Sequence, residues 1–551
     1  MISKDDIFGY KPDPKYKKSV AYFSMEFAID QALKIYSGGL GFLAGSHMRS
    51  AYELKQNTIG IGMLWKNGYY DQFRDLNADM KPMFVEKQYS FLEDTGILFT
   101  VPIHDSPVHV KAYLLKPQTF GSAPVFLLTT NLNENDEVSR SITYKLYDSN
   151  EATRIAQSII LGTGGAMLLD LLGLDIDVYH MNEGHSLPLN FYLYAKYQSL
   201  KEVQKRVVFT THTPEAAGNE EHRFSLLKEM SFFYHLQEHE VKHILGVEGD
   251  SLNYTVAALK FARKANGVSK MHAEVAREMW KGNSGICKII AITNAQNKTY
   301  WKDEQLEKAL ADKNDEAIVS RKKEMKRDLF KVVADQCGKL FDENILTIVW
   351  ARRFAGYKRA DLLMRDWDRF IKLVYNSEYP VQVIWAGKPY PEDFGAIEQF
   401  NQIIRRAKPI PNCAVLTGYE LALSAVAKKG SDVWLNNPTM YREASGTSGM
   451  TATFNGSINL SLPDGWVPEF AQDMKNCFVI KPASTDLTHD ERDKLEAESL
   501  MDILENIVLP MYYKDKKKWL AIVKKASADI VPAFDSGRMV DEYYQQMYSG
   551  K

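Results

Sequence analysis

The chain has 551 residues, more than one hydrophobic core can serve, so the sequence predicts two domains. Its composition, 45% hydrophobic and 25% charged, is that of an ordinary globular protein. A formal net charge of −2 gives no electrostatic footprint for nucleic acid or for an anionic membrane surface, so small or neutral partners are favoured.

The cysteines and the N-terminus indicate a reducing compartment. The four cysteines are far apart and form no CxxC pair, which argues against a disulfide framework and a thiolate metal site. The opening residues MISKDDIFGYKPDPKYKK are charged and interrupted by proline, unlike a signal peptide, and no later apolar run reaches membrane-spanning length. We therefore expect a cytoplasmic protein.

Short apolar runs alternate with longer amphipathic stretches along the chain. The predicted strands, with the number of their first residue, are RVVFTT (206), CKIIAIT (287), NILTIVWA (344), VQVIWAG (381), CAVLTG (413), DVWLN (432) and NCFVIK (476). Such alternation is typical of parallel sheets covered by helices on both faces. A single polar helix is predicted over residues 303–336, and its alternating charges indicate a solvated face.

The alternation of strand and helix becomes regular after residue 293, and this change predicts the domain boundary. The expected N-terminal domain covers residues 1–293, with a C-terminal helix of about residues 530–551 packed back on it. The expected C-terminal domain covers residues 294–529. Ligands of doubly wound sheets bind at the carboxyl ends of the strands, so two such domains facing each other would enclose a cleft. The predicted fold class is α/β, with two Rossmann-like domains.

Two motifs rich in small residues point to an anion. YSGGLGFLAGSHMRSAYEL places Gly38, Gly39 and Gly41 before a helical pattern, where backbone N–H groups can approach an anion closely. REASGTSGMTATFNGS follows the strand DVWLN, and its Glu443 can accept hydrogen bonds from sugar hydroxyls. A tight turn in the first motif and a flexible Ser/Gly loop in the second are the structural alternatives.

Basic residues and histidines also follow predicted strands. Arg353 and Lys358 in ARRFAGYKRADLL follow the strand ILTIVW, and a guanidinium with an ammonium suits a phosphate or diphosphate. A solvated basic loop is the alternative. His185 and His212 each come directly after an apparent strand. A histidine there can equally be structural, so neither is assigned as a general base.

The segment HEVKH, residues 239–243, fits the HExxH pattern in which two histidines on one helix face bind zinc. His235 lies on the same face. No glycine-and-histidine signature follows to complete such a site, so an exposed helix face is favoured and no metal site is predicted.

These motifs occur together and in the same order as in the α-glucan phosphorylases, which act on glycogen, starch and maltodextrin, and the chain looks most like their compact bacterial and archaeal branch. The resemblance runs from AYFSMEFAIDQALKIYSGGLGFLAGSHMRSAYEL through NEGHS, FTTHTPEAAG, ANGVSKMHAEVAREMW, ITNAQNKTYW, RRFAGYKRADLL and VWLNNPTMYREASGTSGM to DGW. It implies the GT-B glycosyltransferase fold, with two Rossmann-like domains facing a central cleft. The N-terminal domain would bind glucan, and the C-terminal domain would hold the phosphate or donor.

The resemblance also implies retaining glucosyl transfer on an α-1,4-glucan or maltodextrin, with phosphate and glucose 1-phosphate as partners. Four residues would carry the reaction: His212 through its backbone carbonyl, Arg353 and Lys358 on the phosphate, and Glu443 on the glucose. A fixed carbonyl dipole can stabilise an oxocarbenium-like transition state while the cations stabilise the leaving phosphate. The substrate-binding residues implied by the family are Gly39, Leu40, His185, Asn294, Ser445, Gly446 and Thr447. Neither nucleic acid nor membrane is implied, and a homodimer stays open.

Family phosphorylases hold pyridoxal phosphate as a Schiff base on a lysine, and Thr451 stands at that position here, with Tyr419 among the residues implied at the cofactor. A hydroxyl cannot form an imine with an aldehyde, so the usual covalent attachment is excluded. Three hypotheses stay open. The chain uses non-covalent pyridoxal phosphate for phosphorolysis, it uses a nucleotide-glucose donor as glycogen synthases do, or it is a glucan-binding pseudoenzyme.

Overall fold

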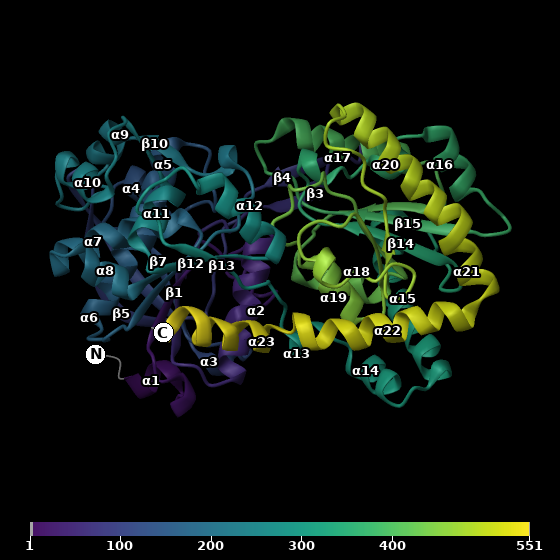
Figure 1. The fold of residues 1–551 in the computed structure, drawn as a ribbon, viewed down its shortest axis with the longest axis horizontal. Helices are drawn as coiled ribbons and strands as arrows, with labels where there is room; N and C mark the ends of the chain where they lie inside the picture. Colours follow the sequence, from purple (N-terminus) through teal and green to yellow (C-terminus); the bar gives the residue numbers. More distant parts are fainter. Residues whose placement is uncertain (1–3, 550–551) are drawn as a thin grey trace. The chain divides into compact units, whose positions relative to one another are not determined.

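The computed structural model describes residues 4–549 and divides the chain into two compact units. Unit 1 comprises Met1–Tyr70, Phe84–Asn297 and Ser536–Lys551, and unit 2 comprises Asp71–Met83 and Lys298–Asp535. Figure 1 follows the chain through both units by colour. Residues 1–3 of the expected N-terminal domain and 550–551 of the expected C-terminal helix lie outside the described residues.

Unit 1 is built on a nine-stranded sheet with the order β13-β12-β9-β8-β1-β2-β7-β6-β5. The pairs from β13 to β7 are parallel, and β6 runs antiparallel to both of its neighbours. The strands of this sheet are β1 (Val20–Phe23), β2 (Thr58–Met63), β5 (Glu93–Ile103), β6 (Ser106–Leu115), β7 (Val125–Thr129), β8 (Val178–Asn182), β9 (Val207–Thr210), β12 (Lys264–Gly267) and β13 (Lys288–Ala291). A short antiparallel pair, β10 (Glu221–Arg223) and β11 (Ser251–Asn253), lies outside it.

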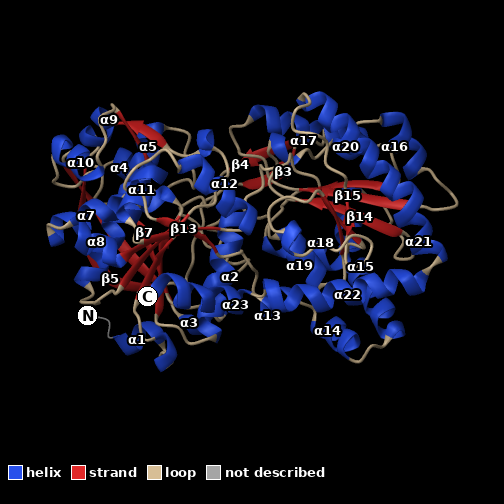
Figure 2. Cartoon of the chain, viewed as in Figure 1, coloured by secondary structure: helices blue, strands red, loops and turns tan. Residues whose placement is uncertain are grey.

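The central strands of unit 1 are buried along their whole length, as expected for a parallel sheet covered by helices on both faces. The covering helices are coloured blue in Figure 2. Their bounds are α1 (Lys4–Phe8), α2 (Gly39–Glu53), α3 (Pro117–Phe120), α4 (Glu137–Ser141), α5 (Glu151–Ile159), α6 (Gly165–Leu171), α7 (Pro188–Tyr197), α8 (Leu200–Arg206), α9 (Phe224–Glu229), α10 (Glu238–Leu245), α11 (Tyr254–Phe261) and α12 (Lys270–Trp280).

The chain returns to unit 1 at its C-terminal end, through α23 (Ser536–Glu542) and the turn of helix Tyr543–Tyr548. The Ser536 hydroxyl lies 2.6 Å from the Ser50 hydroxyl of α2, and the Tyr548 hydroxyl lies 2.6 Å from Nδ1 of His180 in β8. The returning segment therefore begins at Ser536, six residues later than the sequence indicated, because α22 (Lys516–Phe534) belongs to unit 2.

Unit 2 contains a six-stranded parallel sheet with the order β16-β15-β14-β17-β18-β19. Its strands are β14 (Leu346–Ala351), β15 (Val381–Ala386), β16 (Cys413–Leu416), β17 (Val433–Asn436), β18 (Ile458–Ser461) and β19 (Phe478–Val479). All seven predicted strands, five in this unit, are present within two residues of the expected ends. The predicted α/β class is confirmed by the parallel sheet of unit 2 and the mainly parallel sheet of unit 1.

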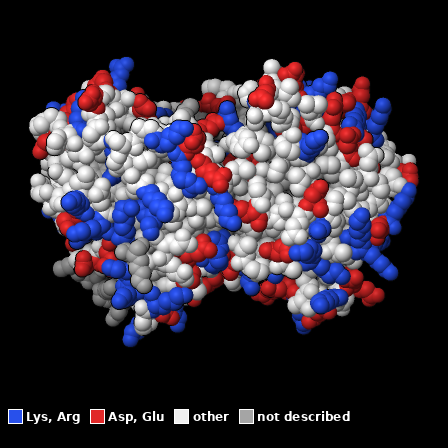
Figure 3. Space-filling view, in the orientation of Figure 1, with Lys and Arg blue, Asp and Glu red and all other residues white. Residues whose placement is uncertain are grey.

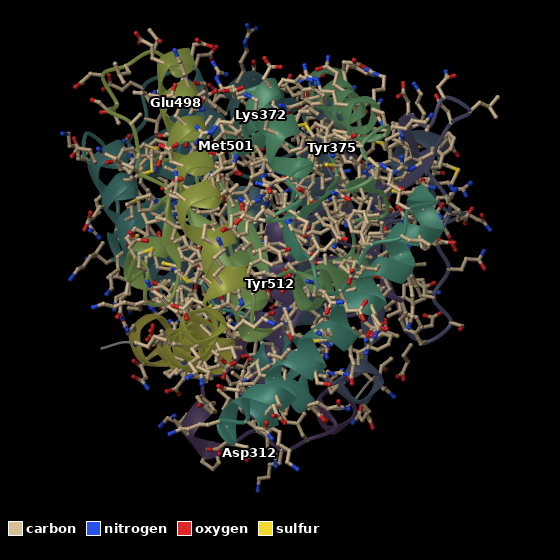
Figure 4. All side chains as sticks on the ribbon, turned by 90° about the vertical axis from the view of Figure 1, so that its right-hand side faces the viewer. Asp312, Lys372, Tyr375, Glu498, Met501 and Tyr512 are labelled. Carbon is tan, nitrogen blue, oxygen red and sulfur yellow. The ribbon has the colours of Figure 1, made fainter. Side chains whose placement is uncertain are left out.

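Helices of unit 2 cover this sheet, and their bounds are α13 (Lys298–Trp301), α14 (Glu304–Ala311), α15 (Asp315–Cys337), α16 (Trp367–Val374), α17 (Phe394–Ala407), α18 (Leu421–Gly430), α19 (Ser448–Phe454), α20 (His489–Ile503) and α21 (Leu509–Lys514). Figure 4 looks onto α16, where Lys372 is labelled, and α20, where Glu498 and Met501 are labelled. Arg369 of α16 forms ion pairs with Asp502 of α20 and with Glu505 just beyond it.

The prediction of a single helix over residues 303–336 is wrong, because this segment forms two helices, α14 and α15. Lys313 has a left-handed φ of 53°, and the Asn314 side chain accepts a hydrogen bond from the N–H of Ala317. Asparagine is among the best N-cap residues, so this short stretch ends one helix and starts the next.

A hairpin that the sequence analysis placed in the N-terminal domain belongs to unit 2. Its strands are β3 (Asp71–Arg74) and β4 (Met80–Met83), paired antiparallel. The Gln72 amide donates to the carbonyl of Gly387, and Asn401 of α17 accepts from the N–H of Met80. These contacts with the β15 end and α17 explain why the hairpin leaves the domain that flanks it in sequence.

Acidic and basic side chains are interspersed on the face drawn in Figure 3, in line with the small net charge. Within residues 4–549, the helices lack the combination of length and apolar composition that crossing a bilayer requires.

Candidate active site

The carboxyl ends of three neighbouring strands in unit 2 carry the charged groups of the candidate site. Arg352 directly follows β14, Glu443 lies in the loop after β17, and Asp464 lies in the loop after β18. Since β14, β17 and β18 are adjacent and parallel, these loops leave the sheet at the same edge. This is the edge at which ligands of open α/β sheets bind.

Lys358 and Glu443, both predicted site residues, form an ion pair in which Nζ lies 2.6 Å from Oε2. Their side chains are only 11% and 13% exposed. Burial alone would raise the pKa of Glu443, but the charges of Lys358, Arg352 and Arg353 outweigh it and hold that pKa below its ordinary value. Glu443 is therefore an ionised hydrogen-bond acceptor surrounded by three cations.

Arg352 is a member of this cluster that the sequence analysis missed. Its guanidinium is buried, donates to the carbonyl of Leu435 and to Oδ1 of Asn436, and lies 5.4 Å from the centre of the Trp350 ring. Burial lowers the pKa of Arg352, and its Nε has no hydrogen-bond partner in residues 4–549. A buried cation with an unused donor is costly unless an anion binds to it. The sequence did offer one signal for Arg352, which is its position directly before the predicted residue Arg353.

The loop that carries Glu443 is held by its own backbone geometry. Gly446 has a φ of 78°, and a Cβ there would lie 3.0 Å from Cγ of Glu443. The carboxylate of Asp464 accepts the N–H of Glu443 at 3.0 Å and the N–H of Gly465 at 2.9 Å. Burial raises the pKa of Asp464 to about 6, to which the charge of Glu443 contributes. Asp464, in the motif DGW, is the second site residue that the sequence analysis left unnamed.

The remaining predicted residues of unit 2 differ in their burial. Arg353 is exposed at the end of β14, and Thr447 is half-buried just before α19. Ser445 is buried, and its hydroxyl finds no partner within the described part of the chain. Tyr419 instead belongs to the core, where its hydroxyl donates to the carbonyl of Ala351 at 3.1 Å.

In unit 1, the glycine loop before α2 is fixed by the buried carboxylate of Glu26. This carboxylate accepts the N–H of Ser37 at 2.6 Å, the N–H of Gly38 at 3.1 Å and the hydroxyl of Tyr147 at 2.8 Å. A Cβ at Gly41 would lie 2.7 Å from Oε2 of Glu26, so only glycine allows this close approach. The predicted residues Gly39 and Leu40, in the first turn of α2, are thus held between Gly38 and Gly41.

His212 is held at its backbone and at its ring. Its N–H donates to Oε2 of Glu183 at 2.7 Å, and its Nε2 lies 2.7 Å from Oδ1 of Asn182. Glu183 has a left-handed φ of 74°, an uncommon conformation for a residue with a side chain and one found at functional sites. Burial lowers the pKa of His212 to about 3, so the imidazole is neutral near pH 7 and is no general acid there. Glu183, in NEGHS, is a third residue that the sequence analysis did not name.

Two further predicted sugar contacts of unit 1 carry unused polar atoms. Nδ1 of His185 and Oδ1 of Asn294 are buried and have no hydrogen-bond partner among the residues described. His185 packs against the ring of Tyr147, and Asn294 follows β13. Buried polar atoms are normally satisfied, so unsatisfied ones at predicted sugar contacts are what a polyhydroxyl ligand would complete.

The HExxH segment lies on α10 with His239, Glu240 and His243 exposed. Glu240 accepts the N–H of Gln237 at 2.7 Å and so caps its own helix. Across the part of the chain that the structure describes, no group of three or more potential metal ligands is found.

Comparison with known proteins gives matches that span the residues of the unit 2 site. The family model for carbohydrate phosphorylases matches residues 251–507, which include every charged residue of the unit 2 cluster. Maltodextrin phosphorylase of Thermococcus litoralis is 33% identical over 597 residues, covering 97% of this chain and 71% of that protein. The chain belongs to the carbohydrate phosphorylase family. This confirms the resemblance and, with the parallel sheets, the GT-B fold class.

Other relatives of this phosphorylase-family chain match along nearly its whole length. Glycogen phosphorylase of Aquifex aeolicus is 31% identical over 620 residues, covering 98% of this chain and 87% of that protein. An uncharacterized protein of Methanocaldococcus jannaschii is 44% identical over 532 residues, covering 96% of this chain and 100% of the relative.

The residues around Thr451 do not fit the pyridoxal phosphate expected of a phosphorylase. Thr451 lies on α19 with 0% of its surface exposed, and its hydroxyl donates to the carbonyl of Ser448 at 3.0 Å. Met450 and Ala452 are equally buried. With no surface accessible to a water-sized sphere, Thr451 borders no cavity that could take a pyridine ring. We therefore assign no step of the reaction to this cofactor.

Proposed function

We propose that this chain is a retaining glucosyltransferase that moves a glucosyl unit between the end of an α-1,4-glucan and a phosphate group, yielding glucose 1-phosphate in the degradative direction. One observation carries the proposal: the ion pair of Lys358 and Glu443, buried beside the Arg352 guanidinium, whose Nε has no hydrogen-bond partner among the described residues. The names of the relatives, maltodextrin phosphorylase and glycogen phosphorylase, support the choice of an α-glucan as substrate.

Unit 2 supplies the groups for the phosphate and for the sugar. Lys358 is a point charge and Arg353 a planar fork, and together they suit a phosphate dianion. Arg352 adds its Nε donor, which has no partner among residues 4–549. Glu443, kept ionised by these cations, accepts hydrogen bonds from glucose hydroxyls. The cations stabilise negative charge on the phosphate as the glycosidic bond breaks.

Unit 1 supplies a fixed dipole for the positive charge that develops on the sugar ring. The backbone carbonyl of His212 takes this role, because Glu183 and Asn182 hold the residue at its N–H and at its ring. A dipole that is already oriented needs no reorganisation during the reaction, which is what makes it effective. His185 and Asn294 supply unused polar atoms for the glucose hydroxyls.

A second candidate function is transfer from a nucleotide-glucose donor. It is favoured by the closed packing around Thr451, because a donor with two phosphates would bring its own second phosphate instead of a cofactor's. Arg352 and Arg353 would then share the diphosphate. In this reading the acceptor is the same α-1,4-glucan.

The test combines binding and turnover. We expect orthophosphate, glucose 1-phosphate or both to raise the thermal unfolding temperature, since a ligand that binds only the folded state stabilises it by mass action. We expect α-glucose 1-phosphate to form from maltodextrin and orthophosphate. Stabilisation and turnover by UDP-glucose or ADP-glucose alone would select the second candidate. Maltodextrin binding without turnover of any donor would mark a pseudoenzyme and refute both.

A further inference from the structure

Lys428 of α18 is a buried lysine that the proposed reaction does not use. Its side chain is 1% exposed, and its Nζ lies 3.8 Å from the centre of the Trp301 ring, at the end of α13. Trp301 is itself only 2% exposed. Burial lowers the pKa of Lys428 well below its ordinary value. Burying a lysine in such a place is energetically unfavourable, and the indole face of Trp301 is one group that stabilises it.

Trp301 and Thr451 are joined through the side chain of Asn455, the residue that directly follows α19. The Asn455 amide donates to the carbonyl of Trp301 at 2.9 Å and to the carbonyl of Thr451 at 2.9 Å. On the other side, Ala427 of α18 and Ala452 of α19 belong to one hydrophobic cluster. Helices α13, α18 and α19 therefore meet at a junction that contains Lys428, Trp301 and Thr451.

This junction is filled by protein atoms. Asn455 and Thr451 are 0% exposed and Thr453 is 1% exposed, in addition to the values for Lys428 and Trp301. A substituted pyridine ring needs a cavity much larger than one water molecule, and these side chains present almost no surface even to a water-sized sphere. The position at which the family anchors its cofactor is thus both chemically altered and sterically closed.

We infer that this chain has no pyridoxal phosphate site, because Lys428 and Trp301 fill the helix junction beside Thr451, and that its anion site works without the cofactor. The second part rests on the proposed function, whereas the first rests only on packing. Binding of the cofactor is measured without any assay of activity, so the two parts can fail separately.

The direct test uses the full-length wild-type protein, produced and purified with pyridoxal phosphate present. We expect no cofactor absorbance band, no pyridoxal phosphate released by acid, and no cofactor adduct on Lys428 after borohydride reduction and peptide mapping. Lys429, its partly exposed neighbour, serves as the matched control for non-specific labelling of surface amines. Stoichiometric cofactor, or an adduct on Lys428 beyond the level on Lys429, would overturn the inference.

The outcome that would overturn the inference, a covalent adduct of pyridoxal phosphate on Lys428, has a defined chemistry. An adduct on Lys428 would form by attack of its neutral amine on the cofactor aldehyde with loss of one water, and the amine would have to leave the Trp301 ring. The variant Lys428→Met keeps the side-chain volume and removes the amine. We expect wild type and K428M to be equally free of cofactor, and a cofactor signal in wild type that is lost in K428M would contradict the filled junction.

Amine labelling tests the packing without any cofactor. In the folded wild-type protein, we expect an acylating reagent to modify Lys429 and to spare Lys428, and unfolding should make both lysines equally reactive. Equal reactivity of the two lysines in the folded protein would show that the junction is open and would overturn the inference. If the packing holds but maltodextrin is not turned over with any donor, only the proposed function is lost.

Discussion

Replacing Glu443 by glutamine tests whether the buried ion pair is the centre of the site. The substitution keeps the shape of the side chain and removes its charge, so Lys358 loses the carboxylate that lies 2.6 Å away. Two charges at that distance attract each other by about 6 kcal/mol at an effective dielectric constant near 20. Desolvation offsets part of this attraction, and breaking one side of a buried pair typically costs about 3 to 5 kcal/mol.

We therefore expect the free energy of unfolding of E443Q to be about 4 kcal/mol lower than that of wild type, because Lys358 and Arg352 remain as buried cations. K358M should also be destabilised, since it leaves the Glu443 carboxylate without its ammonium. The double variant should recover much of the loss, which gives a coupling energy of about 3 kcal/mol in a double-mutant cycle. Urea unfolding of the four proteins provides the measurement.

The same variant separates binding from catalysis. With Glu443 neutral, Lys358 has no competing anion, so we expect orthophosphate to raise the unfolding temperature of E443Q more than that of wild type. Glucosyl transfer should fall, because the glucose loses its ionised acceptor.

The more exposed pair Lys524–Asp315, at 2.8 Å with side chains 34% and 49% exposed, is the matched control in unit 2. Its coupling energy should be at most about 1 kcal/mol, as for other surface pairs. A coupling between Lys358 and Glu443 as small as this control, or phosphate stabilisation lost in E443Q, would refute the argument.

Three further substitutions have defined outcomes. Arg352→Met should weaken orthophosphate binding roughly 30-fold, the equivalent of about 2 kcal/mol for a charge-assisted hydrogen bond. It should also lower the free energy of unfolding by about 1 to 3 kcal/mol, because the buried acceptors of Leu435 and Asn436 lose their donor. Unchanged phosphate affinity would make Arg352 structural. Gly446→Ala should cost about 1 to 3 kcal/mol and reduce kcat by displacing Glu443, because its φ is 78°, whereas Gly395→Ala in α17, without a positive φ, should not; equal effects would contradict the strain argument. The pKa of Asp464 is about 6 in the folded protein and about 4 in the unfolded chain, so the folded protein binds this proton more tightly. The free energy of unfolding of wild type should therefore fall by up to about 3 kcal/mol as the pH rises from 4 to 6, and D464N should lack this fall. Parallel pH profiles of the two proteins in urea unfolding would contradict the raised pKa.

The strands could be predicted from the sequence because each is a short, mainly apolar run, as in the fully buried β14 (Leu346–Ala351) and β15 (Val381–Ala386). The break between α14 and α15 could not, because the charged residues around Asn314 suit both a helix surface and a cap. The transfer of the hairpin β3–β4 to unit 2 rests on long-range contacts of Gln72 and Met80, which no local pattern reveals.

The candidate site was predictable to the extent that residues after strands bear charge. Lys358 and Glu443 were named from their motifs, and the structure brings them together. Arg352, Asp464 and Glu183 were missed because their importance lies in burial and in the backbone groups that they hold, neither of which a sequence motif displays. The roles of His185, Asn294 and Ser445 stay predictions, supported by their unused polar atoms.

The central claim is tested most directly by following maltodextrin and orthophosphate with the purified wild-type protein by phosphorus and proton NMR, without added pyridoxal phosphate. The account predicts that α-glucose 1-phosphate accumulates, with its anomeric configuration retained, and that E443Q forms far less. Bound maltodextrin with no glucose 1-phosphate, and no transfer from glucose 1-phosphate or from a nucleotide-glucose in the reverse direction, would contradict it.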